Sequence, residues 1–230
     1  MKPFDRSGSA SVARRRKRHF CGFAAALVLT SGLASAAQAN EQFGNDAVAL
    51  DWQGSDLAQM RIVDGLNDRT IAVTAPFALH LEDGTVLTPA DLVAQGAPQA
   101  STIAGDPNAA RLADRGPRKQ LVMHFADRTG RFAIDWALTQ LPDAKYLRGA
   151  ITITALKADE KLTRIDLFTA TAPQAEVMGR VNGSPIVAGP DYLQFESPLS
   201  KSEVGVDRAT IRMWIDRALP IEKGKSVTYS

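Results

Sequence analysis

Short segments in which apolar and polar residues alternate are the feature that most constrains the fold of this chain. Clear examples are residues 146–155, 162–170, 191–196 and 210–215. Such alternation places the apolar side chains on one face of a β-strand. Roughly ten of these segments follow one another at intervals of about ten residues, and helical periodicity is scarce. The pattern predicts an all-β fold, a large antiparallel β-sandwich of the supersandwich kind.

Glycine, proline, asparagine and aspartate mark the turns between these segments. Asp83-Gly84 predicts a two-residue hairpin turn, because both residue types tolerate positive φ. Thr88-Pro89 predicts a short helical turn, with the threonine as its cap and the proline at its first position. Residues 105–117 are rich in Asp, Pro, Asn, Arg and Gly, which predicts a surface loop. No repeat or linker interrupts residues 40–230, so we expect a single domain there.

Residues 1–39 have the three parts of a cleavable signal peptide. These are the basic run Arg14–Arg18, the apolar run Phe23–Leu29 and the small-x-small cleavage site Ala37-Gln38-Ala39. A helix needs about 20 apolar residues to span a bilayer, and this run is shorter, so no stable membrane anchor is expected. We therefore predict export to the periplasm or the outside of the cell, with cleavage after Ala39.

Removal of this leader changes both the charge and the cysteine content. Seven of the 27 basic residues and one of the 25 acidic residues lie before residue 40, which leaves 20 basic and 24 acidic residues and a net charge of −4. A weakly acidic domain offers no broad basic surface, so we expect no nucleic-acid partner. Cys21 is the single cysteine and leaves with the leader, so neither disulfide nor thiol chemistry is expected.

Residue types that carry catalysis are not clustered in this sequence. His80 and His124 lie in alternating segments without further ligands at metal-binding spacing. Gly183-Ser184-Pro185 lacks the second small residue of a nucleophile elbow, and the glycines form no nucleotide-binding loop. We expect no metal, no cofactor and no catalytic residue. A glycosidase needs two carboxyl groups about 5–10 Å apart across a sugar, and no pair of carboxyl groups stands out in the sequence, so a complete small hydrolase is the last-ranked hypothesis.

The densest irregular segment is residues 181–200. One interpretation is a hairpin with Asn182-Gly183 at its tip. The other is a sugar-contacting rim, with Tyr192, Glu196 and Asp191 as the candidate carbohydrate-binding residues. An aromatic ring stacks on the C–H groups of a sugar, and a carboxylate accepts hydrogen bonds from sugar hydroxyls.

The same segment resembles a family of large secreted bacterial glycosidase-like proteins. These proteins are related to α-galactosidases and are sometimes labelled enterotoxins. The resemblance rests on the run Val181–Gly189, on Tyr192 and on Phe195-Glu196-x-Pro198-Leu199-Ser200. Weaker matches at residues 77–84 and 219–230 extend the resemblance over about residues 45–230.

This resemblance implies that a second domain carries the catalytic residues. In the family an N-terminal β-sandwich is followed by a (β/α)₈ barrel that holds the catalytic carboxylates. Residues 225–230 alternate like a strand, and the barrel of the relatives would begin after them. We therefore expect a non-catalytic sandwich of a longer protein, with the barrel and a carbohydrate as its partners. Gln194 and Ser197 stand where the family pattern has a glycine and a histidine.

A self-contained exported carbohydrate-binding module is the alternative hypothesis. Trp52, Trp136, Tyr192 or Trp214 would then stack on a glycan. Most of these aromatic residues lie in alternating segments, where large rings usually belong to the core.

Overall fold

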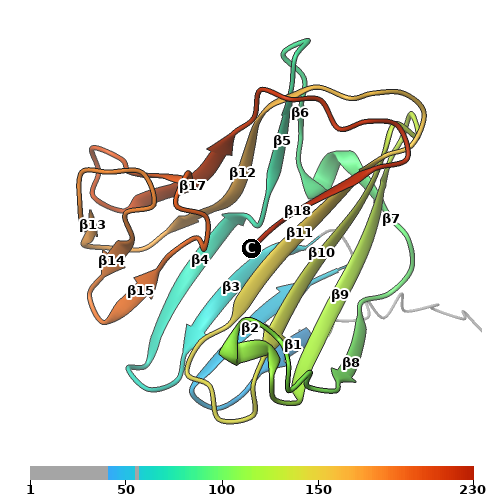
Figure 1. The fold of residues 1–230 in the computed structure, drawn as a ribbon. Helices are drawn as coiled ribbons and strands as arrows, with labels where there is room; N and C mark the ends of the chain where they lie inside the picture. Colours follow the sequence, from blue (N-terminus) through green and yellow to red (C-terminus); the bar gives the residue numbers. More distant parts are fainter. Residues whose placement is uncertain (1–40, 55–56) are drawn as a thin grey trace, which may run out of the picture. The chain divides into compact units, whose positions relative to one another are not determined.

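Residues 41–54 and 57–230 are described by the computed structural model, and they form a nearly all-β structure (Figure 1). Strands hold 53% of these residues and helices 3%, and the strands pair in antiparallel sheets. The prediction of an all-β antiparallel sandwich is therefore confirmed. The predicted signal peptide, residues 1–39, lies outside the described residues.

The largest sheet contains nine strands. They are β1 (Glu41–Gly44), β2 (Val48–Gln53), β3 (Ala58–Asp64), β4 (Arg69–Ala75), β5 (Ala78–Leu81), β6 (Val86–Leu87), β12 (Leu162–Thr171), β16 (Lys201–Val204) and β17 (Thr210–Asp216). Their order across the sheet is β1-β2-β3-β4-β12-β17-β16, and β5 pairs with both β12 and β6.

Two smaller sheets and two short 3₁₀ helices complete the described structure. The six-stranded sheet consists of β7 (Leu92–Ala94), β8 (Gln99–Ile103), β9 (Arg118–Asp127), β10 (Phe132–Gln140), β11 (Arg148–Ala155) and β18 (Ser226–Tyr229). Its order is β18-β11-β10-β9-β7, with β8 also paired to β9. The three-stranded sheet consists of β13 (Ala175–Val177), β14 (Ile186–Ala188) and β15 (Asp191–Leu193), and the helices are η1 (Pro89–Asp91) and η2 (Leu112–Asp114).

Both smaller sheets cover the same face of the nine-stranded sheet. The buried side chains of β4 and of β17 alternate with more exposed ones, so on each strand they share one face. On that face Val73 and Ile215 belong to the main hydrophobic cluster, whereas Ile71 and Ile211 belong to a second cluster with the three-stranded sheet. Figure 1 shows β13, β14 and β15 beside β17 and β4 and away from β7 and β9. A seam therefore separates the two covering sheets.

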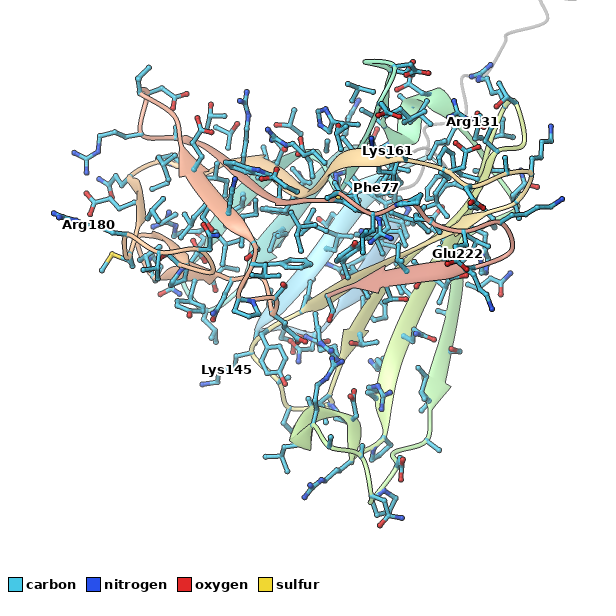
Figure 2. All side chains as sticks on the ribbon, turned by 45° about the horizontal axis from the view of Figure 1, so that its top comes forward. Phe77, Arg131, Lys145, Lys161, Arg180 and Glu222 are labelled. Atoms are coloured by element: carbon cyan, nitrogen blue, oxygen red, sulfur yellow. The ribbon has the colours of Figure 1, made fainter. Side chains whose placement is uncertain are left out.

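The main cluster joins the nine-stranded sheet to the six-stranded sheet. Phe77 is fully buried, and its ring meets the ring of Phe125 edge to face, with 5.8 Å between the centroids. Figure 2 shows Phe77 inside the fold, whereas Arg180 and Lys145 extend from its outer loops. Burial of one such ring contributes about 1.5–3 kcal/mol, so contacts of this kind hold the two layers together.

The hairpin predicted at Asp83-Gly84 forms, but its loop has three residues and not two. The N–H of Leu81 donates to the carbonyl oxygen of Thr85 at 2.8 Å, which leaves residues 82–84 in the loop. A three-residue loop needs the left-handed conformation only at its last position. Gly84 supplies it with φ of +85°, while the carboxylate of Asp83 accepts a hydrogen bond from the N–H of Thr85 at 2.8 Å.

The helical turn predicted at Thr88-Pro89 is helix η1. The backbone N–H and the hydroxyl of Thr88 both donate to the carboxylate of Asp91, at 2.9 and 2.7 Å. The predicted loop at residues 105–117 contains helix η2 and has no strand.

Several strands, among them β2, β7 and β8, are absent from the sequence prediction. Strand β8 shows why, because four of its five residues are exposed and it has no apolar face. It forms through backbone pairing with β9, from Gln99 opposite Val122 to Ile103 opposite Arg118. Strand formation at a sheet edge of this kind leaves no periodic signal in the sequence.

The segment from 181 to 200 differs only in part from its predicted form. The predicted strand 191–196 ends at Leu193, as β15. The predicted hairpin is the pair β13–β14, and the loop between these strands has the predicted turn at Asn182-Gly183, where the N–H of Ser184 donates to the carbonyl oxygen of Val181 at 3.2 Å. The N–H of Gly183 donates to the carbonyl oxygen of Ser200 at 2.6 Å, so this loop is attached to the chain that follows β15.

Candidate functional site

A cavity of about 630 Å³ opens at the seam between the two covering sheets. Its walls come from all three sheets. Met60 and Leu167 belong to the nine-stranded sheet, Trp136 and Ile151 to the six-stranded sheet, and Leu193 to the three-stranded sheet. The cavity exists because the buried face of the largest sheet has two separate covers.

Three large apolar side chains lie at the seam itself. Ile62, Phe168 and Phe195 are half-buried, pack against both hydrophobic clusters and line the cavity. Each therefore packs on protein on one side and faces open space on the other. Such a wall is typical of a preformed site for an apolar group.

Polar residues gather at the mouth of the cavity around Glu196. Nη2 of Arg148 donates to Oε2 of this carboxylate at 2.9 Å, and Nε of Arg148 lies 2.5 Å from Oε1 in an ion pair without hydrogen-bond geometry. Arg111 donates from Nη1 to Oε2 at 3.0 Å, and the hydroxyl of Ser230 donates to the same oxygen at 3.1 Å. The backbone N–H of Glu196 donates to the carbonyl oxygen of Ser230 at 3.0 Å. We call two groups of residues together the rim: Tyr192, Gln194, Glu196, Arg148 and Ser230, which line the cavity, and Arg111 and Asp114, which contact Glu196 and Arg148.

A second carboxylate holds the arginines of the rim in place. Asp114 accepts a hydrogen bond from Nη1 of Arg148 at 3.2 Å, and its Oδ1 lies 3.6 Å from Nη2 of Arg118. Nε of Arg111 lies 4.0 Å from the other oxygen of Asp114. The predicted surface loop at 105–117 thus has a structural role at the rim, which its composition did not reveal.

Tyr192 is the exposed aromatic residue of the rim. Its side chain is 61% exposed, and its hydroxyl donates to Oε1 of Gln194 at 2.6 Å. Alternation along β15 exposes Tyr192, while its half-buried neighbours Asp191 and Leu193 lie on the other face of the strand. The hydrogen bond to Gln194 restrains the ring, and Tyr192 and Glu196, two of the three sequence candidates, line the same cavity.

Asp191, the third candidate, does not line the cavity. Its Oδ2 lies 3.3 Å from Nε of Arg69, in an ion pair without hydrogen-bond geometry. Burial raises the pKa of Asp191 above its ordinary value; the guanidinium of Arg69 opposes this shift, and the neighbouring carboxylate of Asp64 adds to it. The contacts of Asp191 attach β15 to the β3–β4 hairpin.

The tryptophans proposed for sugar stacking have three different environments. Trp52 is buried, with 2% of its surface exposed. Trp214 is half-buried, and the guanidinium of Arg164 lies 4.3 Å from the centroid of its ring. Trp136 is also buried but contributes to the wall of the cavity.

His80 and His124, the two histidines in the described part of the chain, have carboxylate partners across a pair of strands. Nε2 of His80 lies 3.1 Å from Asp166, and Nδ1 of His124 lies 2.6 Å from Asp135. Residues 41–54 and 57–230 contain no group of three or more His, Cys, Asp or Glu side chains placed to hold a metal ion. In the same part of the chain, no helix is long and apolar enough to cross a membrane.

Neither the models of known protein families nor the curated proteins contain a match to this chain. Glu196 and Tyr192 were identified from the sequence because their types suit sugar binding and they lie close together. Arg148 and Arg111 were not, since they are 48 and 85 residues from Glu196 and no local pattern marks them.

Proposed function

We propose that this chain is a non-catalytic β-sandwich of a glycoside hydrolase-like protein, which supports a catalytic (β/α)₈ barrel and contributes the rim to a sugar site. One observation carries the proposal. Tyr192 and Glu196 lie together at the mouth of one cavity, beside Arg148. The resemblance of residues 181–200 to the α-galactosidase-related family supports a galactoside as the sugar.

The chemistry of the rim suits a neutral, hydroxyl-rich ligand. Tyr192 presents an exposed ring face for stacking, and Glu196 presents a carboxylate that is 44% exposed. The guanidinium groups of Arg148 and Arg111 donate hydrogen bonds, while Gln194 and Ser230 can donate or accept them. A sugar hydroxyl needs both kinds of partner, and the rim offers both within one short stretch of surface.

The pairing of the rim carboxylates favours binding over catalysis. A glycosidase needs one carboxyl group that can donate a proton and a second that acts as base or nucleophile. Glu196 and Asp114 both accept hydrogen bonds from arginines, which favour the ionised form of each carboxyl group over a proton donor. We therefore assign them a role in holding the rim, and the chemistry to the barrel of the longer protein.

A self-contained carbohydrate-binding module is the second candidate, and the packing of the core favours it. The main cluster closes between the sheets with side chains of this chain alone, including fully buried Phe77, Phe132 and Ile134. A domain with a complete core can bind a sugar without a neighbouring barrel.

Calorimetric titration of the full chain with methyl galactosides tests sugar binding. We expect saturable binding in the millimolar range and an affinity about tenfold lower in Tyr192→Ala, because the stacking surface is lost. Tyr192→Phe keeps the ring and should retain most of the affinity. Val206→Ala, at a fully exposed site outside the cavity lining, is the control.

Two results would contradict the proposal. One is the absence of saturable binding with galactosides of either anomer. The other is turnover of an aryl galactoside by the chain alone that disappears when a single carboxylate is substituted, since a complete active site would then be present.

A further inference from the structure

We propose that the cavity behind the rim holds the apolar chain of an amphiphilic glycoside whose sugar lies on the rim. The sugar end of this ligand rests on the proposed function. The apolar end rests on the cavity itself, which extends behind the polar rim into the seam between the sheets.

The size and lining of the cavity fit an apolar group of substantial length. About 630 Å³ lies within the range of about 300–1,000 Å³ that is common for small-molecule sites. A monosaccharide on the rim leaves the inner space unused. Leu50, Met60 and Leu167 line that inner space and offer no polar side-chain partner, so ordered water would gain few hydrogen bonds there.

The half-buried residues at the seam indicate how an apolar chain would gain affinity. Ile62, Phe168 and Phe195 each have protein on one side and the cavity on the other. An alkyl chain would cover their open sides and leave water at the same time. Each methylene removed from water raises affinity by up to about fourfold.

The charges at the mouth favour a neutral head group. Arg148 and Glu196 are the two charged residues among those that line the cavity, and they are paired with each other. A free fatty acid would have to compete with Glu196 for the guanidinium, at the cost of an ion pair. A glycoside can add hydrogen bonds to the pair without separating it.

Titration with matched ligands tests the inference. The probes are methyl galactoside, octyl galactoside below its micellar concentration, and octan-1-ol, each added to the full chain in a calorimeter. We expect octyl galactoside to bind at least a hundredfold more tightly than methyl galactoside, with a more negative heat-capacity change from the buried chain. Equal affinity of the two galactosides would overturn the inference.

The three probes separate this inference from the proposed function. If methyl and octyl galactoside bind equally and octanol does not bind, the rim binds sugar and the cavity inference fails. If octanol binds as tightly as octyl galactoside and methyl galactoside does not bind, the cavity takes an apolar chain and the proposed function fails.

A cavity-filling variant gives an independent test. Gly149 lies on β11 opposite Leu138, and a side chain there would point into the cavity, with its Cβ 3.7 Å from Leu138 Cδ2. Gly149→Phe should abolish the advantage of the octyl chain. Ala137→Phe is the matched control on the neighbouring strand, because Ala137 is outside the cavity lining and alternates with the inward Trp136 and Leu138.

Folding of both variants is checked by circular dichroism before titration. Trp136 supplies a second readout that needs no cavity-filling change, since an apolar ligand beside its ring should alter its fluorescence. Persistence of the octyl advantage in folded Gly149→Phe, together with unchanged emission of Trp136 in the wild-type chain, would contradict the inference.

Discussion

Glu196 connects parts of the chain that are far apart in sequence. Its carboxylate accepts hydrogen bonds from Arg111 and Arg148, and its backbone N–H binds the carbonyl oxygen of Ser230. One side chain thus ties the loop at 105–117 and strand β11 to the segment that follows β15. The side chain of Arg148 is only 18% exposed, so this ion pair is more sheltered than an ordinary surface pair.

Glu196→Gln should lower the free energy of unfolding by about 1 kcal/mol, because Arg111 and Arg148 each lose one of their two charged partners, and the lost carboxylate is partly exposed. Chemical denaturation at low and high salt measures the loss, which salt should reduce. The control is Glu222→Gln, at an exposed glutamate for which the described residues provide no ion pair (Figure 2). Equal stability of the two variants at low salt would contradict the role of Glu196.

Asp207 should make stability depend on pH in the acid range. Hydrogen bonds from the hydroxyl and N–H of Thr210 and from the N–H of Ala209 lower its pKa from 3.8 to about 2. Because the folded pKa is depressed, the stabilisation is present above about pH 4 and is lost as the pH falls toward 2. Asp207→Asn should flatten the fall of unfolding free energy in this window. An unchanged pH profile in the variant would exclude this contribution.

Strand β15 and its flanking loops form the element that carries the candidate residues. The strand is only three residues long, and its alternation separates exposed Tyr192 from Asp191. The loop before β14 is fastened to the chain after β15 by the hydrogen bond from Gly183 to Ser200. The positive φ of Gly183, +79°, is part of this attachment.

Gly183→Ala should destabilise the fold by about 1–3 kcal/mol, because the left-handed conformation strains a residue with a Cβ. The new Cβ would also lie 3.1 Å from Cα of Pro198. Gly84→Ala is the matched control, since it has φ of +85° and open space around the Cβ position. Thermal unfolding should show the larger loss for Gly183→Ala, and equal losses would mean that the contact with Pro198 is unimportant.

The arrangement of three sheets determines both the stability of the domain and the existence of its cavity. The main cluster holds two sheets together, and the second cluster attaches the small sheet to the same face. The cavity lies where these two clusters approach each other. Rigid layers on either side would keep it open before a ligand binds.

Phe77→Ala should lower the free energy of unfolding by about 3–5 kcal/mol, because it removes a fully buried ring and its contact with Phe125. Val206→Ala, at a fully exposed site, should change it by less than about 0.5 kcal/mol. Urea unfolding followed by fluorescence and by circular dichroism measures both. If the two signals gave separate midpoints for Phe77→Ala, the sheets would not share a single core.

Much of the local structure was predictable from the sequence. Strand β12 has an alternating segment that predicts it within a few residues, and Gly84 and Thr88 mark the turn and the cap that form around them. Strand β8 was not predictable, because it has no apolar face and depends on pairing with β9. The turn at Asn182-Gly183 was predictable from its residue types, whereas the hydrogen bond from Gly183 to Ser200 depends on tertiary structure.

The candidate site also has a part that was predictable from the sequence and a part that was not. Residue type and nearness in the chain were enough to select Tyr192 and Glu196 from the sequence. The separation of Asp191 from them, the arrival of Arg148 and Arg111, and the cavity behind the rim depend on tertiary structure. The alternation of strand residues and the residue types of turns are local patterns, so the sequence alone predicts the strands and turns that they form. The seam forms only when two sheets from distant segments cover one face, so no single segment of the sequence encodes it.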